Sequence, residues 1–146
     1  MSRLACMAAV LFLALLALSG CVPDRGPTMR PGEDCLSCHG AGTGAEIGPA
    51  WSVAGTVFDG TFAEQEAGLR GAILRLTDSN GRKLSLETNA GGNFYSAEAL
   101  AFQLQSACLE RGSKVYCMLK EVPQGSCNTC HAAQPRWTAP GRLVAP

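Results

Sequence analysis

The stretch GAILRLTDSNGRKLSLETNAGGNFY, residues 71–95, decides the fold. Apolar and polar residues alternate on each side of Ser79-Asn80-Gly81, and a period of two is typical of strands with one buried face. An Asn-Gly pair between two such runs is a strong signal of a β-hairpin. A second turn-rich run, residues 89–93, then precedes Phe94-Tyr95. The stretch therefore predicts two paired strands and the start of a third.

The same pattern continues outward from this hairpin. SVAGTVFDG (52–60) precedes it, and LAFQL (100–104) and residues 107–119 follow it. Five or six short strands over about 70 residues favour a sandwich over a helical fold. We therefore predict a mainly β protein, a small antiparallel β-sandwich flanked by short irregular or helical segments.

A further hairpin is expected around Gly112-Ser113, which suits a type II′ turn with glycine at its first central position. Counting outward from this turn places Cys108 opposite Cys117 in a non-hydrogen-bonded pair. Facing side chains come closest in that kind of pair. The register therefore predicts a Cys108–Cys117 disulfide, with two free buried thiols as the alternative.

The first twenty residues have the features of an export signal. After Arg3, residues 4–18 form an unbroken apolar run, which is shorter than the about 20 residues of a typical membrane span. The run ends in Leu18-Ser19-Gly20-Cys21, which resembles the lipobox of bacterial lipoproteins. The resemblance implies cleavage before Cys21, acylation of Cys21 and a lipid anchor, at the outer membrane facing the periplasm. An ordinary secretory signal is the alternative.

The expected organisation has four parts. A signal peptide (1–20) precedes a lipid-anchored linker with a first cysteine motif (21–50), a β-sandwich domain (51–120), and a second cysteine motif with the tail (121–146). This length suits one ordinary domain with short appendages. Lys and Arg total 12, Asp and Glu also total 12, and no basic run occurs. That balance argues against nucleic-acid binding.

Both histidines of the chain stand directly behind a Cys-x-x-Cys pair. The two motifs are CLSCH (35–39) and CNTCH (127–131). Two thiols three residues apart, followed by an imidazole, suit the thioether links and the iron ligand of a c-type haem. The pattern predicts two covalently bound haem c groups, with His39 and His131 as iron ligands. The attachment residues would be Cys35, Cys38, Cys127 and Cys130.

Other uses of these cysteines stay open. Four thiolates could hold one tetrahedral zinc ion, although the two pairs lie much farther apart in sequence than the pairs of common zinc motifs. Thioredoxin-like chemistry would place a Cys-x-x-Cys pair at the end of a strand in a βαβ pattern, which neither pair shows. A plain disulfide within each pair is a third use.

Since both histidines are taken, bis-histidine ligation of a haem within one chain is excluded. The methionines outside the signal peptide, Met29 and Met118, each lie shortly before a Cys-x-x-Cys-His motif. A thioether is a common axial haem ligand. The sequence therefore predicts Met29 and Met118 as iron ligands, with ordinary apolar packing as the alternative.

Two family resemblances extend these expectations. Residues 52–104 resemble the carboxypeptidase regulatory-like or transthyretin-like β-sandwich domains through Gly55-Thr56-Val57, Leu76 to Gly81, Thr88-Asn89, Gly92 and Phe94. This resemblance implies a fold, because such domains serve mostly as structural or binding modules. The complete arrangement resembles exported dihaem cytochrome c lipoproteins of bacteria. The matching residues are Cys21, Met29, Pro31, Gly32, Cys35, Cys38, His39, Cys127, Cys130, His131, Pro140, Gly141 and Arg142.

The expected function is that of a lipid-anchored dihaem c-type cytochrome, which transfers single electrons in the periplasm or at the outer membrane. Its partners would be other redox proteins. Alternatives are a haem peroxidase or reductase with an open sixth position, and a partner-binding β-sandwich module. We expect an electron carrier rather than an enzyme, because no histidine is left for a Ser-His-Asp or Cys-His set.

The position of the two haem sites depends on the sandwich between them. If the ends of the sandwich lie on one side, as domain termini often do, the two haems would be close neighbours. After the second motif, Arg136, Trp137 and Arg142 could contact haem propionates or shield a ring edge, with a solvated tail as the alternative.

Overall fold

The structure is a computed structural model that describes residues 26–43, 48–60, 67–134 and 139–146. The predicted signal peptide, the predicted acylation site Cys21, Arg136 and Trp137 lie outside the described residues. No helix among the described residues is long and apolar enough to cross a membrane. The elements are α2 (Leu36–His39), β1 (Val53–Phe58), β2 (Ile73–Thr77), β3 (Lys83–Glu87), β4 (Asn93–Ser96), β5 (Ser106–Arg111), β6 (Lys114–Cys117), α3 (Cys127–Cys130) and β7 (Leu143–Val144).

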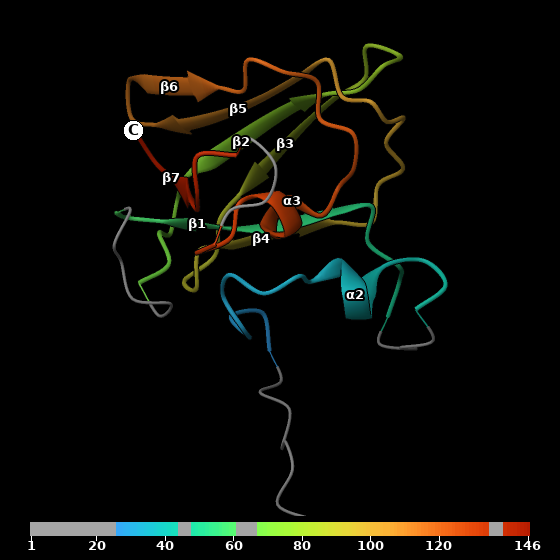
Figure 1. The fold of residues 1–146 in the computed structure, drawn as a ribbon, viewed down its shortest axis with the longest axis horizontal. Helices are drawn as coiled ribbons and strands as arrows, with labels where there is room; N and C mark the ends of the chain where they lie inside the picture. The colour runs from blue at the N-terminus through green and yellow to red at the C-terminus, as the bar shows by residue number, and fades with distance from the viewer. Residues whose placement is uncertain (1–25, 44–47, 61–66, 135–138) are drawn as a thin grey trace, which may run out of the picture.

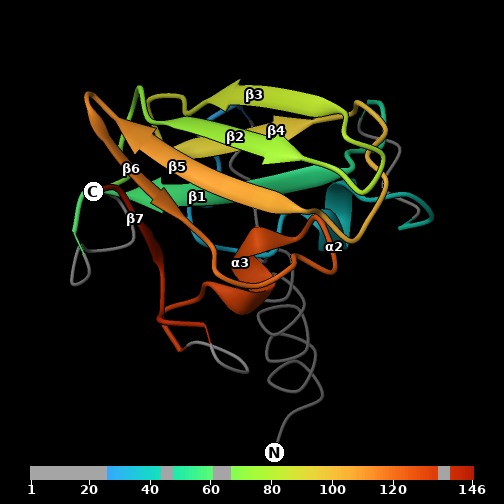
Figure 2. The ribbon, with the colours of Figure 1, turned by 90° about the horizontal axis from the view of Figure 1, so that it is seen from above.

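The strands form two sheets. One has four strands in the order β3-β2-β5-β6, and the other has three in the order β4-β1-β7. Neighbouring strands are antiparallel except β1 and β7, which run parallel. In Figure 1 the four-stranded sheet lies above β1 and β4, with α2 below them, and Figure 2 gives the view from above. The prediction of a small, mainly β sandwich is confirmed.

The core lies between the two sheets. In β2, Leu74 and Leu76 are buried while Arg75 between them is exposed, as the period-two pattern predicts. In β1 every residue is buried, because segments outside the sandwich cover its second face. The buried hydrophobic cluster comprises Val53, Val57, Ala72, Leu74, Leu76, Leu84, Phe94, Leu104, Leu109 and Val122.

The turn between β2 and β3 is held by a single carboxylate. Asp78 Oδ1 accepts hydrogen bonds from the N–H groups of Asn80 and Arg82, both at 2.9 Å, and Asp78 Oδ2 accepts one from Ala101 N–H at 3.1 Å. Gly81 has a φ of 82°, a left-handed conformation that favours glycine. The Ser79-Asn80-Gly81 signal therefore does mark a hairpin, with Thr77 opposite Lys83.

Asp78 should make the stability of the fold sensitive to acid. The hydrogen bond from Ala101 N–H, followed by those from Arg82 and Asn80, lowers the pKa of this buried carboxyl group below its ordinary value. Such a group stabilises the fold above its unfolded pKa and loses this contribution as the pH falls through its folded pKa. We expect the Tm to drop as the pH falls below about 4, and Asp78→Asn to flatten that dependence. Thermal unfolding from pH 7 to pH 2.5 measures both, and identical slopes would contradict the assignment.

Two segments differ from the sequence-based expectation. Residues 100–104 form no strand, and only Leu104 pairs, through an isolated bridge to Val122. The reason is that this chain is bonded to the β2–β3 turn instead: Ala101 N–H donates to Asp78, and Ala101 O accepts from Ser79 N–H at 3.1 Å. In the tail, β7 pairs with β1 over Val57 and Phe58, so the sandwich extends into the segment expected to lie outside it.

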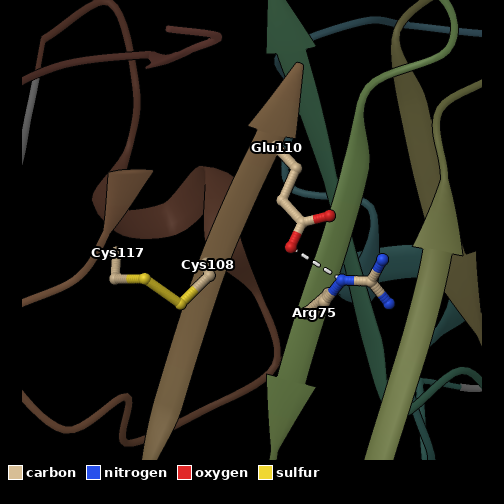
Figure 3. Close-up of a disulfide and its surroundings, with 4 residues drawn as sticks. All are labelled: Arg75, Cys108, Glu110 and Cys117. Carbon is tan, nitrogen blue, oxygen red and sulfur yellow. Dashed lines mark hydrogen bonds and ion pairs between the residues drawn. A yellow bond between two sulfur atoms is a disulfide. The ribbon is translucent and has the colours of Figure 1, made fainter. Parts of the chain in front are cut away.

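The second hairpin has the predicted register. Cys108 lies opposite Cys117, with a Cα–Cα distance of 4.0 Å, and the two residues form a disulfide. Beside it on the outer face of the sheet, Arg75 Nε donates to Glu110 Oε1 at 2.7 Å (Figure 3). The prediction of this disulfide from the position of the turn is confirmed.

Candidate functional site

The two Cys-x-x-Cys-His motifs form the same single helical turn. In α2, His39 N–H donates to Cys35 O at 2.9 Å, and in α3, His131 N–H donates to Cys127 O, also at 2.9 Å. In each turn the thiol of the first cysteine faces the carbonyl oxygen two residues earlier, at 3.5 Å in α2 and 3.7 Å in α3. The repeat in sequence is therefore also a repeat in structure.

The second turn, α3, is seated on strand β1. Ala54 N–H donates to Gly125 O at 3.0 Å, and Thr56 N–H donates to Asn128 Oδ1, also at 3.0 Å. The Asn128 side chain thus takes the place of a strand neighbour along this edge of β1. Between these two contacts stands Gly55, where an added Cβ would lie 2.8 Å from Cys127 Cβ. Only a residue without a side chain lets α3 approach this closely.

The segment before α2 is bound to the same strand. Gly32 N–H donates to Thr56 Oγ1 at 2.9 Å, and Thr56 Oγ1 donates to Asn93 Oδ1 at 2.8 Å. Asn93 Nδ2 in turn donates to Met29 O at 2.9 Å. Together with Asn128, whose Nδ2 lies 3.1 Å from Thr56 Oγ1, Thr56 and Asn93 form a buried polar network. This network holds the segment leading to α2 and the α3 turn against strand β1.

The residues directly before α2 are also hydrogen-bonded to the segment that carries α3. Asn128 Nδ2 donates to Glu33 O at 2.8 Å. Ser126 Oγ donates to Asp34 Oδ1, and these two residues immediately precede the first cysteine of each motif. The chain segments that carry the two motifs are therefore neighbours in the fold. In Figure 1, α3 lies beside β1 and α2 lies below β1 and β4.

The two histidines have different surroundings. His131 is buried, its Nδ1 lies 2.9 Å from Gly141 O, and its Nε2 has no hydrogen-bond partner among the described residues. His39 is half-buried, and its ring stacks on Trp51 with centroids 4.1 Å apart. Trp51 stacks in turn on Tyr95, also at 4.1 Å.

The four cysteines of the motifs are free thiols in this structure. Burial, with smaller contributions from Cys130 and Cys35, raises the pKa of the Cys127 thiol to about 12. Burial also raises the pKa of the Cys35 thiol above its ordinary value. Cys38, by contrast, is exposed. Since the thiolate is the reactive form, these raised pKa values make the Cys35 and Cys127 thiols poorly reactive at neutral pH.

The ligand arrangement corrects the prediction of two covalently bound haem c groups. Within residues 26–43, 48–60, 67–134 and 139–146, no three side chains of His, Cys, Asp or Glu form a group that could hold a metal ion. The physical reason is that the thiols and imidazoles are divided between two separate turns, where His39 packs on Trp51 and His131 faces Gly141. The same finding argues against a zinc ion held by all four thiolates.

The two methionines lie in different settings. Met29 is half-buried in the segment before α2, and Met118 is 39% exposed directly after β6. Nothing in the structure tests their thioethers as ligands, so that assignment stays a prediction, tied to a haem that the ligand arrangement does not support. Arg142, considered as a contact for haem propionates, has its guanidinium carbon 4.7 Å from the centroid of the Phe58 ring.

Sequence patterns did not identify the residues that assemble the site. Thr56, Asn93 and Asn128 form its buried network, yet none of them belongs to the Cys and His pattern. The one available signal was Thr56, a hydroxyl in the otherwise apolar run VAGTVF. A buried hydroxyl needs hydrogen-bond partners, but the sequence does not say where they come from.

Comparison with known proteins found no relative of this chain. No protein-family model matches the chain, and no curated protein or solved structure does so. The resemblances to transthyretin-like domains and to dihaem lipoproteins therefore stay predictions. The function has to be inferred from the site itself.

Proposed function

We propose that the protein is an exported electron-transfer protein, and that the face formed by α2 and α3 is its redox site. One observation carries this proposal: the fold brings the segment directly before the first Cys-x-x-Cys-His turn against the second turn, through hydrogen bonds from Ser126 to Asp34 and from Asn128 to Glu33. Four free thiols lie in these turns, while Cys108 and Cys117 in the same fold are joined. In an exported protein, structural cysteines are normally paired. Unpaired cysteines concentrated in two matching turns therefore favour a chemical role.

The redox groups that the chain itself supplies here are thiols. When a Cys-x-x-Cys pair closes, two S–H bonds are replaced by one S–S bond, and two electrons and two protons leave the pair. A disulfide of a partner protein accepts them and becomes two thiols. Cys38 is the attacking group in α2, because its side chain is exposed. Cys35 then resolves the mixed disulfide.

The location follows from the first part of the chain. The apolar run 4–18 and the Leu18-Ser19-Gly20-Cys21 sequence support export and a lipid anchor at Cys21, in the periplasm and at the outer membrane. An anchored protein meets donors and acceptors close to the membrane. The partners that fit are therefore other exported redox proteins with an accessible disulfide or dithiol.

Thiol chemistry at this face can be measured on the exported, purified protein. After mild reduction, iodoacetamide at neutral pH should alkylate Cys38 much faster than Cys127, as mass spectrometry of timed samples would show. Oxidation by a small disulfide should then protect all four cysteines. Cys38→Ser should abolish electron donation from α2 and leave the α3 pair active, whereas Ser37→Ala, the control in the same turn, should keep both pairs.

Two outcomes would overturn the proposal. Thiols that stay reduced under every oxidant would remove the electron-transfer function. A strong visible absorption band, together with cysteines that resist alkylation in the unfolded chain, would show an attached prosthetic group in place of free thiols. The absorption spectrum should therefore be recorded on the same sample before any thiol is modified.

A further inference from the structure

The thiol of Cys35, the first cysteine of the first motif, lies beside the second motif. Cys35 Sγ lies 3.5 Å from Glu33 O, and Asn128 Nδ2 donates to the same oxygen at 2.8 Å. The Cys35 thiol therefore lies no farther from the Asn128 amide than these two distances laid end to end. Asn128 directly follows Cys127 in the chain. The Cys35 thiol is thus next to the turn that begins with Cys127.

A second contact brings the two first cysteines to the same boundary. Ser126 Oγ donates to Asp34 Oδ1. Ser126 directly precedes Cys127, and Asp34 directly precedes Cys35. Since the residue after Cys127 bonds the same segment, Cys127 is flanked on both sides by residues that bond the chain directly before Cys35. Of the four motif cysteines, these two are the ones adjacent in sequence to the contact.

The electrostatics of the thiols agree with this placement. Burial raises the pKa of the Cys127 thiol most, and the negative charges of the Cys130 and Cys35 thiolates raise it further. The effect of a charge falls with distance, so a charge at Cys35 acts on Cys127 only because the two groups are near each other. Both are free thiols in the structure. The first cysteines of the two motifs are therefore neighbours that can react.

Neighbouring thiols of two Cys-x-x-Cys pairs can exchange a disulfide. When the α3 pair is oxidised and the α2 pair is reduced, the Cys35 thiolate attacks the Cys127 sulfur, and Cys130 leaves as a thiolate that takes up a proton. Cys38 then attacks Cys35, which forms the Cys35–Cys38 disulfide. Cys127 leaves in this second step and takes up the other proton. Two electrons and two protons pass from α2 to α3, and no outside oxidant is consumed.

The raised pKa values of Cys35 and Cys127 do not block this exchange. They lower the thiolate fraction, which slows the reaction with a reagent from solution. A thiol that is held beside a disulfide meets it at a high effective concentration, which offsets the small thiolate fraction. Cys38 is exposed, whereas Cys127 and Cys130 are half-buried. A partner from solution therefore reaches the α2 pair more easily than the α3 pair.

We propose that α2 and α3 exchange electrons through a transient disulfide between Cys35 and Cys127, so that the four thiols act as one relay. The inference rests on the proposed function and adds a route to it. A partner disulfide or dithiol then needs to reach only Cys38 to oxidise or reduce both pairs.

A double variant of the full mature chain tests the central bond. Cys38→Ser with Cys130→Ser keeps Cys35 and Cys127, and oxidised glutathione at neutral pH should join them in a disulfide. The control, Cys35→Ser with Cys127→Ser, keeps Cys38 and Cys130 and should carry two separate glutathione adducts. We expect the linked fraction to be at least about tenfold higher than in the control. Mass spectrometry distinguishes the products, because a linked chain retains no glutathione.

Two further substitutions connect this bond with the contact between the motifs. Ser126→Ala removes the hydrogen bonds to Asp34 and Thr129, whereas Thr129→Ala removes only the one between Thr129 and Ser126. In the variant that keeps Cys35 and Cys127, Ser126→Ala should slow closure of the disulfide at least about threefold, and Thr129→Ala should leave the rate unchanged. Equal rates in the two variants would show that the contact does not align the thiols.

The wild-type chain separates failure of the relay from failure of the proposed function. Partial oxidation followed by acid trapping should yield a tryptic peptide with Cys35 joined to Cys127. If Cys35–Cys38 and Cys127–Cys130 disulfides form and the cross-linked peptide does not, and the double variant gives only glutathione adducts, the relay is overturned and thiol electron transfer stands. If no motif thiol is oxidised, both proposals fail.

Discussion

Asn128→Ala should lower the free energy of unfolding by about 3 kcal/mol and loosen α3 from β1. The Asn128 side chain accepts from Thr56 N–H at 3.0 Å and donates to Glu33 O at 2.8 Å and to Thr56 Oγ1 at 3.1 Å. Asn128 is only 3% exposed, so water cannot readily replace these bonds. A buried group that loses its partner costs roughly 1–3 kcal/mol, and the substitution leaves at least two such groups.

Urea unfolding of Asn128→Ala beside Thr129→Ala measures this effect. Thr129 lies in the same turn and is half-buried, and among the described residues its hydroxyl bonds only the Ser126 hydroxyl, at 2.8 Å. Thr129→Ala should therefore cost less than about 1 kcal/mol. In Asn128→Ala the alkylation of Cys127 should also become faster, because the turn no longer rests on the sheet. Equal losses in the two variants would show that Asn128 does not seat α3.

Gly55→Ala should destabilise the protein by about 2 kcal/mol, in the range found for overpacked cores. The added Cβ would lie 2.6 Å from Phe94 Cζ and 2.8 Å from Cys127 Cβ, closer than such atoms can approach. Either the Phe94 ring or the α3 turn has to move. Phe94 lies on β4 and α3 is bonded to β1, and Gly55 on the central strand β1 meets both, so the strain reaches the core and the α3 turn together.

A matched glycine and a compensating change make this prediction specific. At Gly60 an added Cβ would meet no atom within 4 Å, so Gly60→Ala should leave the Tm unchanged. Gly55→Ala combined with Phe94→Leu should reveal which neighbour gives way. If Cys127 still reacts faster with iodoacetamide in the double variant than in Phe94→Leu alone, α3 has moved. If Gly55→Ala melts like Gly60→Ala, the close approach of α3 is not required for the fold.

The hairpins were predictable because their determinants are local. The turn at Gly112-Ser113 sets the register that faces Cys108 with Cys117, and Asn80-Gly81 sets the one between β2 and β3. Turn chemistry and a period-two pattern act over a few residues. A sequence therefore contains the information needed to place these strands and their disulfide.

Pairings that depend on distant chain were not predictable in the same way. Residues 100–104 alternate like a strand, yet Asp78 and Ser79 take the hydrogen bonds of Ala101. Strand β7 is Leu143–Val144, too short to show a pattern, and it exists because β1 offers a free edge there. Whether a segment becomes a strand depends on which backbone groups lie beside it.

For the candidate site, the cysteine and histidine spacing located both turns, and each does form the same helical turn. Spacing within a motif also suggested haem, but the convergence of ligands is a property of the fold, and no metal-holding group assembles among the described residues. The spacing of Cys and His therefore locates each turn, but it does not tell whether the side chains of the turns converge on one metal ion.

By itself the sequence determined the β class, the two hairpins, the Cys108–Cys117 pair and the location of the two Cys-x-x-Cys-His turns. The tertiary structure alone decided that those turns meet on β1, that Gly55 admits Cys127, and that Asn128 completes the edge of the strand. The physical reason is the distance along the chain over which each interaction acts. Strand and turn preferences act between near neighbours, whereas the Thr56 hydroxyl is satisfied by Gly32, Asn93 and Asn128, which only the folded chain brings together.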